Sequence, residues 1–161
     1  MNKPQAFTAE LPADFDMNSV VWDRYTGKPD PDYTIDYSIA VAASDIPGNK
    51  VDLLVRWAPN AYCHYHRHLG ATKVAVIEGE QHIIEERGLE TIHKIRKAGF
   101  RGQVPDGEVH EERAGPNGLV MLFSIHAPAN GVAFEVLDEN DQVIASPTVE
   151  DFVARRLGAK K

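Results

Sequence analysis

The sequence predicts an all-β protein, a sandwich or barrel with one short helix near the C-terminus. From residue 33 onward the chain carries about ten short runs of β-branched or alternating residues, separated by Pro, Gly and Asn turn signals. These turn signals recur at intervals of about 8–12 residues, which is typical of antiparallel sandwiches and barrels. A helical pattern is found only in the tail after residue 147.

The predicted elements divide the chain into three parts. Residues 1–33 are rich in Pro, Asp and Asn and predict an arm over the domain, with one short strand at residues 20–22. Residues 34–147 form the predicted barrel, and residues 148–161 the helix and tail. The helix is expected to begin after a capping Thr148 and to pack Phe152, Val153 and Leu157 against the sheets. The predicted strands cover residues 37–42, 51–57, 74–77, 82–85, 91–95, 99–104, 109–113, 119–126 and 132–137.

Length and composition indicate one domain and narrow the class of partner. A chain of 161 residues can bury a core without disulfides. Its formal net charge of -7 argues against nucleic acid and anionic membranes, which favour clustered Lys and Arg. The single cysteine, Cys63, excludes an internal disulfide, and the first residues lack the apolar run of a signal peptide. No stretch approaches the roughly 20 apolar residues that span a bilayer. We therefore expect a cytoplasmic protein that binds a small molecule.

Four histidines are the most informative residues of the chain. His64, His66 and His68 occupy every second position, and His110 follows later. Alternate residues of an extended strand point to the same face, so these imidazoles can converge. Imidazole nitrogen binds late first-row metals well, and three histidines leave open positions for water, substrate or oxygen. A closed barrel favours this arrangement, because alternate residues from several strands face one another inside it.

The segment around His110 resembles the second sequence motif of the cupin superfamily. That motif reads Gly-x5-Pro-x-Gly-x2-His-x3-Asn, and Gly99, Pro105, Gly107 and His110 match it. Ala114 stands where the family has Asn. Four residues of these types at fixed spacing are a rare coincidence, so the likeness specifies the fold. It implies a cupin jelly-roll β-barrel.

The first cupin motif, Gly-x5-His-x-His-x3-4-Glu-x6-Gly, is matched in part. His66, His68 and Gly79 keep its spacing, whereas Asn60 and Thr72 replace its first glycine and its glutamate. With the histidine of the second motif, the resemblance implies a metal held by His66, His68 and His110. Three neutral ligands leave a divalent metal with a charge of +2, which suits a chelating, enolisable substrate.

Within the superfamily the chain looks like the three-histidine dioxygenases that cleave acetylacetone and related diketones, and like the dihydroxyacetophenone dioxygenase group. This likeness extends over roughly residues 50–146 and implies Fe(II), O₂ and a β-diketone or hydroxyketone-like substrate. Zn, Ni or Mn are alternative metals, since imidazole accepts them all. A metal-dependent lyase or isomerase and a non-catalytic binding protein stay open as alternatives. A homodimer or homotetramer is expected.

Three further residues are candidates for catalysis. Glu112 lies two positions after His110 and is expected to face the interior, as a base or as a partner that orients a ligand imidazole. Thr72 could hydrogen-bond metal-bound water or only fill space. His64 shares the alternation of the ligands and is expected nearby. Its alternatives are a hydrogen-bond donor to the site, a substrate contact, a fourth metal ligand or a strand end at the barrel mouth. Cys63, with the opposite parity, is expected to point away from the metal.

Overall fold

The structure is a computed structural model that describes residues 6–156. Within this range it contains ten strands and one helix, so the all-β prediction is confirmed. The elements are β1 (Asp23–Thr26), β2 (Asp36–Asp45), β3 (Lys50–Trp57), β4 (His66–His68), β5 (Ala71–Arg87), β6 (Glu90–Lys97), β7 (Arg101–Val104), β8 (Val109–His126), β9 (Phe134–Leu137), β10 (Val143–Ala145) and α1 (Val149–Val153).

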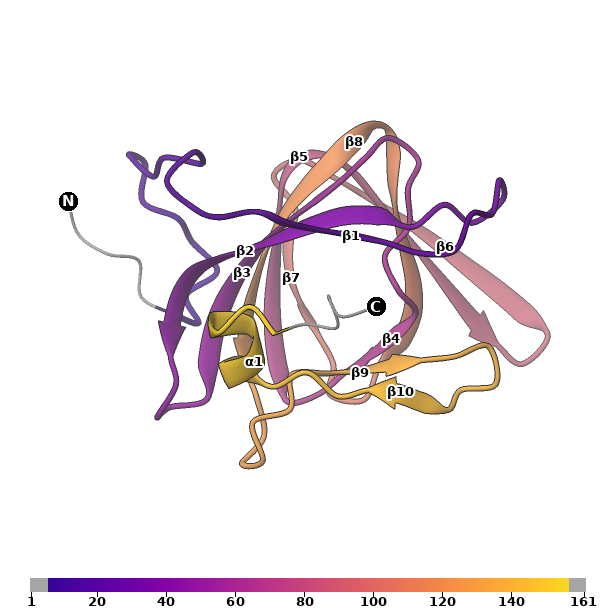
Figure 1. Cartoon of the computed structure of the whole chain (residues 1–161). Coiled ribbons are helices and arrows are strands. Elements are labelled where there is room, and N and C mark those ends of the chain that lie inside the picture. The colour runs from indigo at the N-terminus through magenta and orange to yellow at the C-terminus, as the bar shows by residue number, and fades with distance from the viewer. Residues whose placement is uncertain (1–5, 157–161) are drawn as a thin grey trace.

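The strands curl around a central core, with α1 beside one end (Figure 1). The principal strand order is β1-β2-β3-β8-β4-β9-β10, and β5 pairs with β6, β7 and β8. Strand β8 connects several strands of the barrel, because its two ends pair with different neighbours. Its first residues pair with β4, whereas residues 119–126 pair with both β3 and β5. The chain around His110 is thereby joined to the strand that carries His66 and His68.

Two predicted strand breaks are absent, and one predicted strand is misplaced. Strand β5 runs through Gly79 as one element, with irregular pairing on either side of it. Strand β8 likewise joins two predicted strands, because β5 pairs with both halves while the Gly-Pro-Asn-Gly stretch between them lies outside the pairing. The strand predicted at residues 20–22 is wrong, since β1 begins at Asp23 and pairs with β2. Turn residues therefore marked irregularities within long strands as well as strand ends.

The segment before β1 lies over the outer face of the sheet. Leu11, Phe15 and Trp22 pack with other arm residues against a small buried cluster of Ala40, Leu54 and Leu122. Two buried polar side chains of the barrel also bind its backbone. Asp52 accepts a hydrogen bond from the amide of Phe7 at 2.8 Å, and Ser124 accepts one from the amide of Ala9 at 2.8 Å. The bond from Ala9, a buried residue, satisfies a donor that would otherwise have no partner.

The burial of Asp52 predicts a pH-dependent stability. Burial raises the pKa of this carboxyl group above its ordinary value, although the Phe7 amide opposes the shift. A raised folded-state pKa stabilises the protein below the unfolded pKa, and this contribution is lost as the pH rises through the folded pKa. We expect Asp52→Asn, which keeps an acceptor for Phe7, to raise the melting temperature at pH 7 relative to wild type. Thermal unfolding should show this difference shrinking as the pH falls toward 4, and a pH-independent difference would contradict the prediction.

The C-terminal helix begins as predicted. The Thr148 hydroxyl accepts a hydrogen bond from the Asp151 amide, and the Asp151 carboxylate accepts one from the Thr148 amide, which forms a capping box. Phe152 is buried and Val153 packs partly against the core, whereas Leu157 lies outside the described residues.

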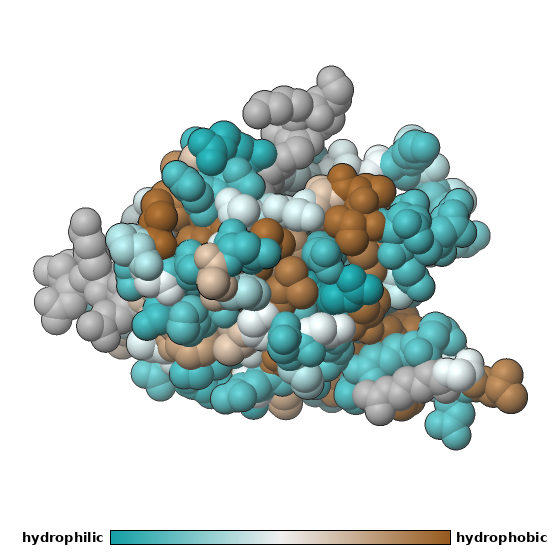
Figure 2. All heavy atoms as spheres, turned by 90° about the horizontal axis from the view of Figure 1, so that it is seen from below, coloured by the Kyte–Doolittle hydropathy of each residue, from teal (hydrophilic) through white to brown (hydrophobic). Residues whose placement is uncertain are grey.

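None of the helices in residues 6–156 has the length and apolar character needed to cross a membrane. Figure 2 shows one face of the molecule, on which hydrophilic side chains predominate and hydrophobic ones form separate patches.

Candidate metal centre

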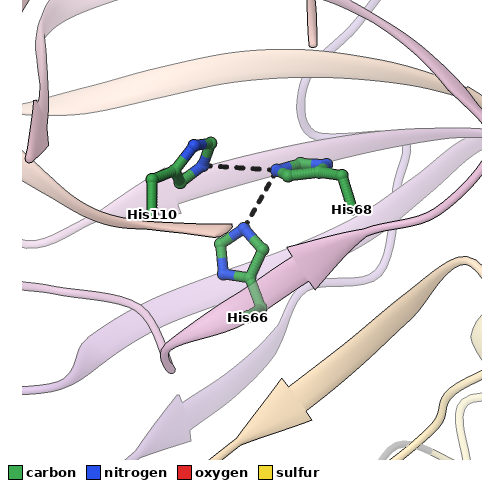
Figure 3. Close-up of side chains that lie close together, drawn as sticks. All are labelled: His66, His68 and His110. Atoms are coloured by element: carbon green, nitrogen blue, oxygen red, sulfur yellow. Dashed lines mark hydrogen bonds between the residues drawn. The ribbon is translucent and has the colours of Figure 1, made fainter. Parts of the chain in front are cut away.

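The pairing of β4 with β8 brings three histidines together. His66 lies directly opposite His110 in the register of the two strands, and His68 follows two residues after His66 on the same face. The Nε2 atom of His68 lies 3.0 Å from that of His66 and 3.3 Å from that of His110. Figure 3 shows the three imidazoles pointing toward one another from the two strands. All three side chains are buried.

Hydrogen bonds on the outer nitrogens fix the orientation of two of these rings. The Nδ1 atom of His66 donates to the backbone carbonyl of His64 at 2.7 Å. The Nδ1 atom of His110 donates to the Glu108 carboxylate at 3.0 Å, and this bond is the main reason why the pKa of Glu108 is lowered. With Nδ1 protonated in a neutral ring, Nε2 carries a lone pair. Both lone pairs are therefore available at the centre of the cluster.

The electrostatics of the cluster favour neutral imidazoles. Burial, followed by the neighbouring His110, lowers the pKa of His66 to about 4, with Glu112 partly opposing the shift. Burial also lowers the pKa of His68 well below its ordinary value, with contributions from His66 and His110. Neutral imidazole is the form that binds metal.

The donor set fits a divalent metal ion. Protein nitrogen ligands lie about 2.0–2.1 Å from such an ion, so neighbouring ligand atoms are expected roughly 3–4 Å apart. The measured Nε2 separations fall in this range. A single proton on Nε2 of His68 would hydrogen-bond poorly to the lone pairs of both His66 and His110. A metal cation, in contrast, can bind all three nitrogens. The three residues predicted as ligands thus form a cluster that can hold a metal.

His64 does not join this cluster. Its Nδ1 atom is 2.8 Å from the Tyr37 hydroxyl, and the two rings make an edge contact. Burial lowers the pKa of His64. Its contact with His66 is made by the backbone carbonyl, not by the imidazole. A role for His64 in binding substrate stays a prediction.

The prediction that Cys63 points away from the cluster is wrong. Its sulfur lies 3.8 Å from Nδ1 of His66 and 3.6 Å from Oε1 of Glu112. Strand β4 begins only at His66, so the two-residue alternation does not extend back to Cys63. The Cys63 amide instead donates to the Glu112 carbonyl, which places the side chain beside β8. Burial, followed by the nearby Glu112 carboxylate, raises the pKa of the Cys63 thiol, so it stays protonated.

Glu112 and Thr72 are both buried, in different surroundings. Glu112 is 2% exposed, and its Oε2 atom accepts a hydrogen bond from the Gln81 amide and lies 4.0 Å from Nε2 of His110. Thr72 lies on β5 opposite residues of β7 and β8, and its hydroxyl has no hydrogen-bond partner among the described residues. Glu112 therefore faces the interior as expected, and its carboxylate borders the cluster.

A pocket of about 440 Å³ opens beside the histidines. His66, Cys63 and Glu112 form part of its wall, together with His64. A volume in this range is typical of sites for small organic ligands, which are mostly apolar with a few polar groups at fixed positions. The rest of the wall is largely apolar and aromatic and includes Tyr37, Leu53, Trp57, Phe123, Phe134 and Phe152.

Sequence reasoning did not identify three polar partners of the site. Tyr37 binds His64, Gln81 binds Glu112, and Glu108 binds His110. A signal existed for Glu108, because an acidic residue close to a candidate ligand histidine can orient its ring. Tyr37 and Gln81 lie on other strands far away in the sequence, so no local pattern connects them with the site.

Comparison with known proteins agrees with the fold. No protein-family model matches the sequence, and no curated protein sequence matches it. An RmlC-like cupin protein from Ralstonia eutropha is 16% identical with a TM-score of 0.65, covering 88% of this chain and 82% of that one. An acetylacetone dioxygenase from Acinetobacter johnsonii is 18% identical with a TM-score of 0.64, covering 99% and 98%. A cupin-2 domain from Rhodospirillum rubrum is 16% identical with a TM-score of 0.59, covering 89% and 94%.

These likenesses identify the fold as the cupin jelly roll, as the sequence motifs predicted. The chain therefore combines a cupin barrel with a buried three-histidine cluster that can hold a metal and an adjoining, largely apolar pocket.

Proposed function

We propose that the protein is a mononuclear metal-dependent dioxygenase that cleaves a C–C bond of a β-diketone or hydroxyketone-like substrate. The observation that carries this proposal is the buried cluster of His66, His68 and His110 at the wall of an apolar pocket. An acetylacetone dioxygenase among the structural neighbours, covered over nearly its whole length, supports the choice of reaction. Fe(II) is the proposed metal, O₂ the proposed co-substrate, and a homodimer or homotetramer the proposed assembly.

The metal and the residues of the pocket have different proposed roles in the reaction. Fe(II), when bound, supplies the chemistry with O₂ and stabilises negative charge on substrate oxygens. The apolar wall binds the substituents of the diketone and excludes water from them. An enolisable diketone loses a proton, and Glu112 is the carboxylate that borders both the cluster and the pocket. We propose Glu112 as the acceptor of that proton and His64 as a contact to a substrate oxygen.

Oxygen uptake tests the proposed reaction. Protein reconstituted with Fe(II) without oxygen should consume O₂ when a β-diketone is added, whereas Zn-loaded protein should not. One oxygen atom is added to each end of the broken bond, so cleavage beside a carbonyl should release one carboxylic acid for each O₂ consumed. Turnover of an enolisable substrate by the Zn form without O₂ would instead establish a lyase or isomerase. Substrate binding without turnover in either form would establish a binding protein.

A further inference from the structure

Tyr37 is fixed in the wall of the pocket by its neighbours on two strands. It lies on β2, opposite Tyr25 of β1 and Trp57 of β3 in the register of the sheet. Its ring stacks on that of Tyr25, with the centroids 5.5 Å apart and an angle of 29° between the planes. All three side chains line the pocket. Pairing on both sides therefore holds the Tyr37 hydroxyl at one place in the wall.

His64, in contrast, lies on an irregular segment between β3 and β4. Within residues 6–156 its imidazole makes one hydrogen bond, in which Nδ1 lies 2.8 Å from the Tyr37 hydroxyl. The two rings also meet edge to face, at an angle of 76°. A side chain on a loop is less constrained by its own backbone than one on a paired strand. The contact with Tyr37 therefore sets the orientation of the His64 ring.

The Tyr37 hydroxyl is the donor in this bond. Burial raises the pKa of Tyr37 above its ordinary value, so the hydroxyl keeps its proton, and no other acceptor among the described residues bonds to it. If Nδ1 of His64 donated instead, the hydroxyl hydrogen would lack a partner in this part of the protein, which is unfavourable for a buried group. A ring nitrogen that accepts carries no proton, so the ring proton of His64 lies on Nε2.

The Nε2 atom of His64 is available to a ligand. It makes no hydrogen bond to a described residue, and it is not among the fully buried polar atoms that lack one. His64 lines the pocket together with His66, and its backbone carbonyl accepts the hydrogen bond that orients the His66 ring. An N–H group in this wall suits an oxygen that accepts, such as the carbonyl or enolate oxygen of a diketone.

We infer that Tyr37 is a positioning residue, which donates to Nδ1 of His64 and so makes Nε2 of His64 a fixed N–H donor for a substrate oxygen. The inference rests on the proposed function for the class of substrate, whereas the bond between Tyr37 and His64 can be tested without substrate. The oxygens of the substrate then face the metal and His64, and its substituents face the apolar part of the wall.

Nitrogen NMR of the Zn-loaded protein without substrate tests the direction of the hydrogen bond. The chemical shifts of the two ring nitrogens show which of them carries the proton, and His64→Ala identifies the signals of His64. We expect the Nε2–H form alone in wild type. In Tyr37→Phe, which removes the donor, the Nδ1–H form should appear beside it. A wild-type ring protonated on Nδ1 would overturn the inference.

A double-mutant cycle tests whether Tyr37 acts through His64. Calorimetric titration of the Zn-loaded protein with acetylacetone, in the absence of oxygen, measures binding. We expect Tyr37→Phe to weaken binding by about fivefold, as for the loss of one hydrogen bond, and His64→Ala to weaken it at least as much. The double variant should bind no more weakly than His64→Ala alone.

The matched control is Tyr62→Phe, which removes a hydroxyl two residues before His64 and outside the pocket wall. Its affinity for acetylacetone should stay within about twofold of wild type. The Zn content and thermal unfolding of each variant, measured on the same preparation, distinguish weaker binding from loss of metal or of the fold.

Two results of the titration overturn the inference. Wild-type affinity in Tyr37→Phe would show that the hydroxyl has no effect on the substrate. Additive losses in the double variant would show that Tyr37 acts independently of His64. If wild type binds no acetylacetone but shows the Nε2–H form that depends on Tyr37, the proposed substrate is wrong and the positioning of His64 by Tyr37 is supported.

Discussion

His68→Ala is expected to reduce bound metal to less than about a tenth of the wild-type content and to abolish diketone-dependent oxygen uptake. Even partners that only orient a ligand are worth about 10–100-fold in metal affinity, so loss of a ligand should cost more. His68 is fully buried, and its Nε2 is the one that lies within 3.3 Å of both other histidines. Elemental analysis after dialysis, with circular dichroism to verify folding, measures the effect. His66→Ala and His110→Ala should behave in the same way.

His64→Ala is the matched control, because it removes an imidazole from the same short segment. The bond that orients His66 uses the backbone carbonyl of residue 64, and alanine keeps that carbonyl. We therefore expect metal content to stay close to wild type while substrate binding weakens. Loss of metal in His64→Ala combined with retention in His68→Ala would show that the ligand assignment is displaced by one histidine.

Gly79→Ala is expected to destabilise the barrel by about 4 kcal/mol, or roughly 10 °C in melting temperature at this chain length. Gly79 has φ +80°, where a side chain is strained, and an added Cβ would lie 2.1 Å from the backbone carbonyl of Gly118. The atom it meets belongs to the β8 backbone beside Leu119, the residue that pairs with Gly79, so relief requires β5 and β8 to separate there. Chemical denaturation of both proteins measures the difference.

Gly99→Ala separates the clash from the backbone strain. Gly99 has φ +97°, but nothing lies within 4 Å of an added Cβ. The strain alone should cost about 1–2 kcal/mol, so this variant should be clearly more stable than Gly79→Ala. Equal losses in the two variants would contradict the importance of the close approach to Gly118.

Much of the fold was predictable because its signals are local. Alternation of apolar residues indicates a strand wherever one face is buried, and turn residues with special backbone angles punctuate it. The capping box at Thr148 and Asp151 is likewise a short-range pattern, and the helix begins there. The same local signals led to the prediction of two shorter strands in place of β5 and two in place of β8. A Gly-rich stretch within a bulged strand has the composition of a turn, so the sequence alone does not distinguish the two.

The sequence by itself determined an all-β chain with cupin motifs and three histidines at ligand spacing, since each depends on residue types a few positions apart. Only the tertiary structure decided which groups meet. The register that places His66 opposite His110 depends on long-range pairing of β4 with β8. Because β4 begins only at His66, the strand alternation does not extend to Cys63, and its side chain points inward to Glu112. The pairing of β5 with β8 places Gln81 beside Glu112. Such contacts form between strands that are distant in the chain, where spacing carries no information and the packing of the barrel selects the neighbours.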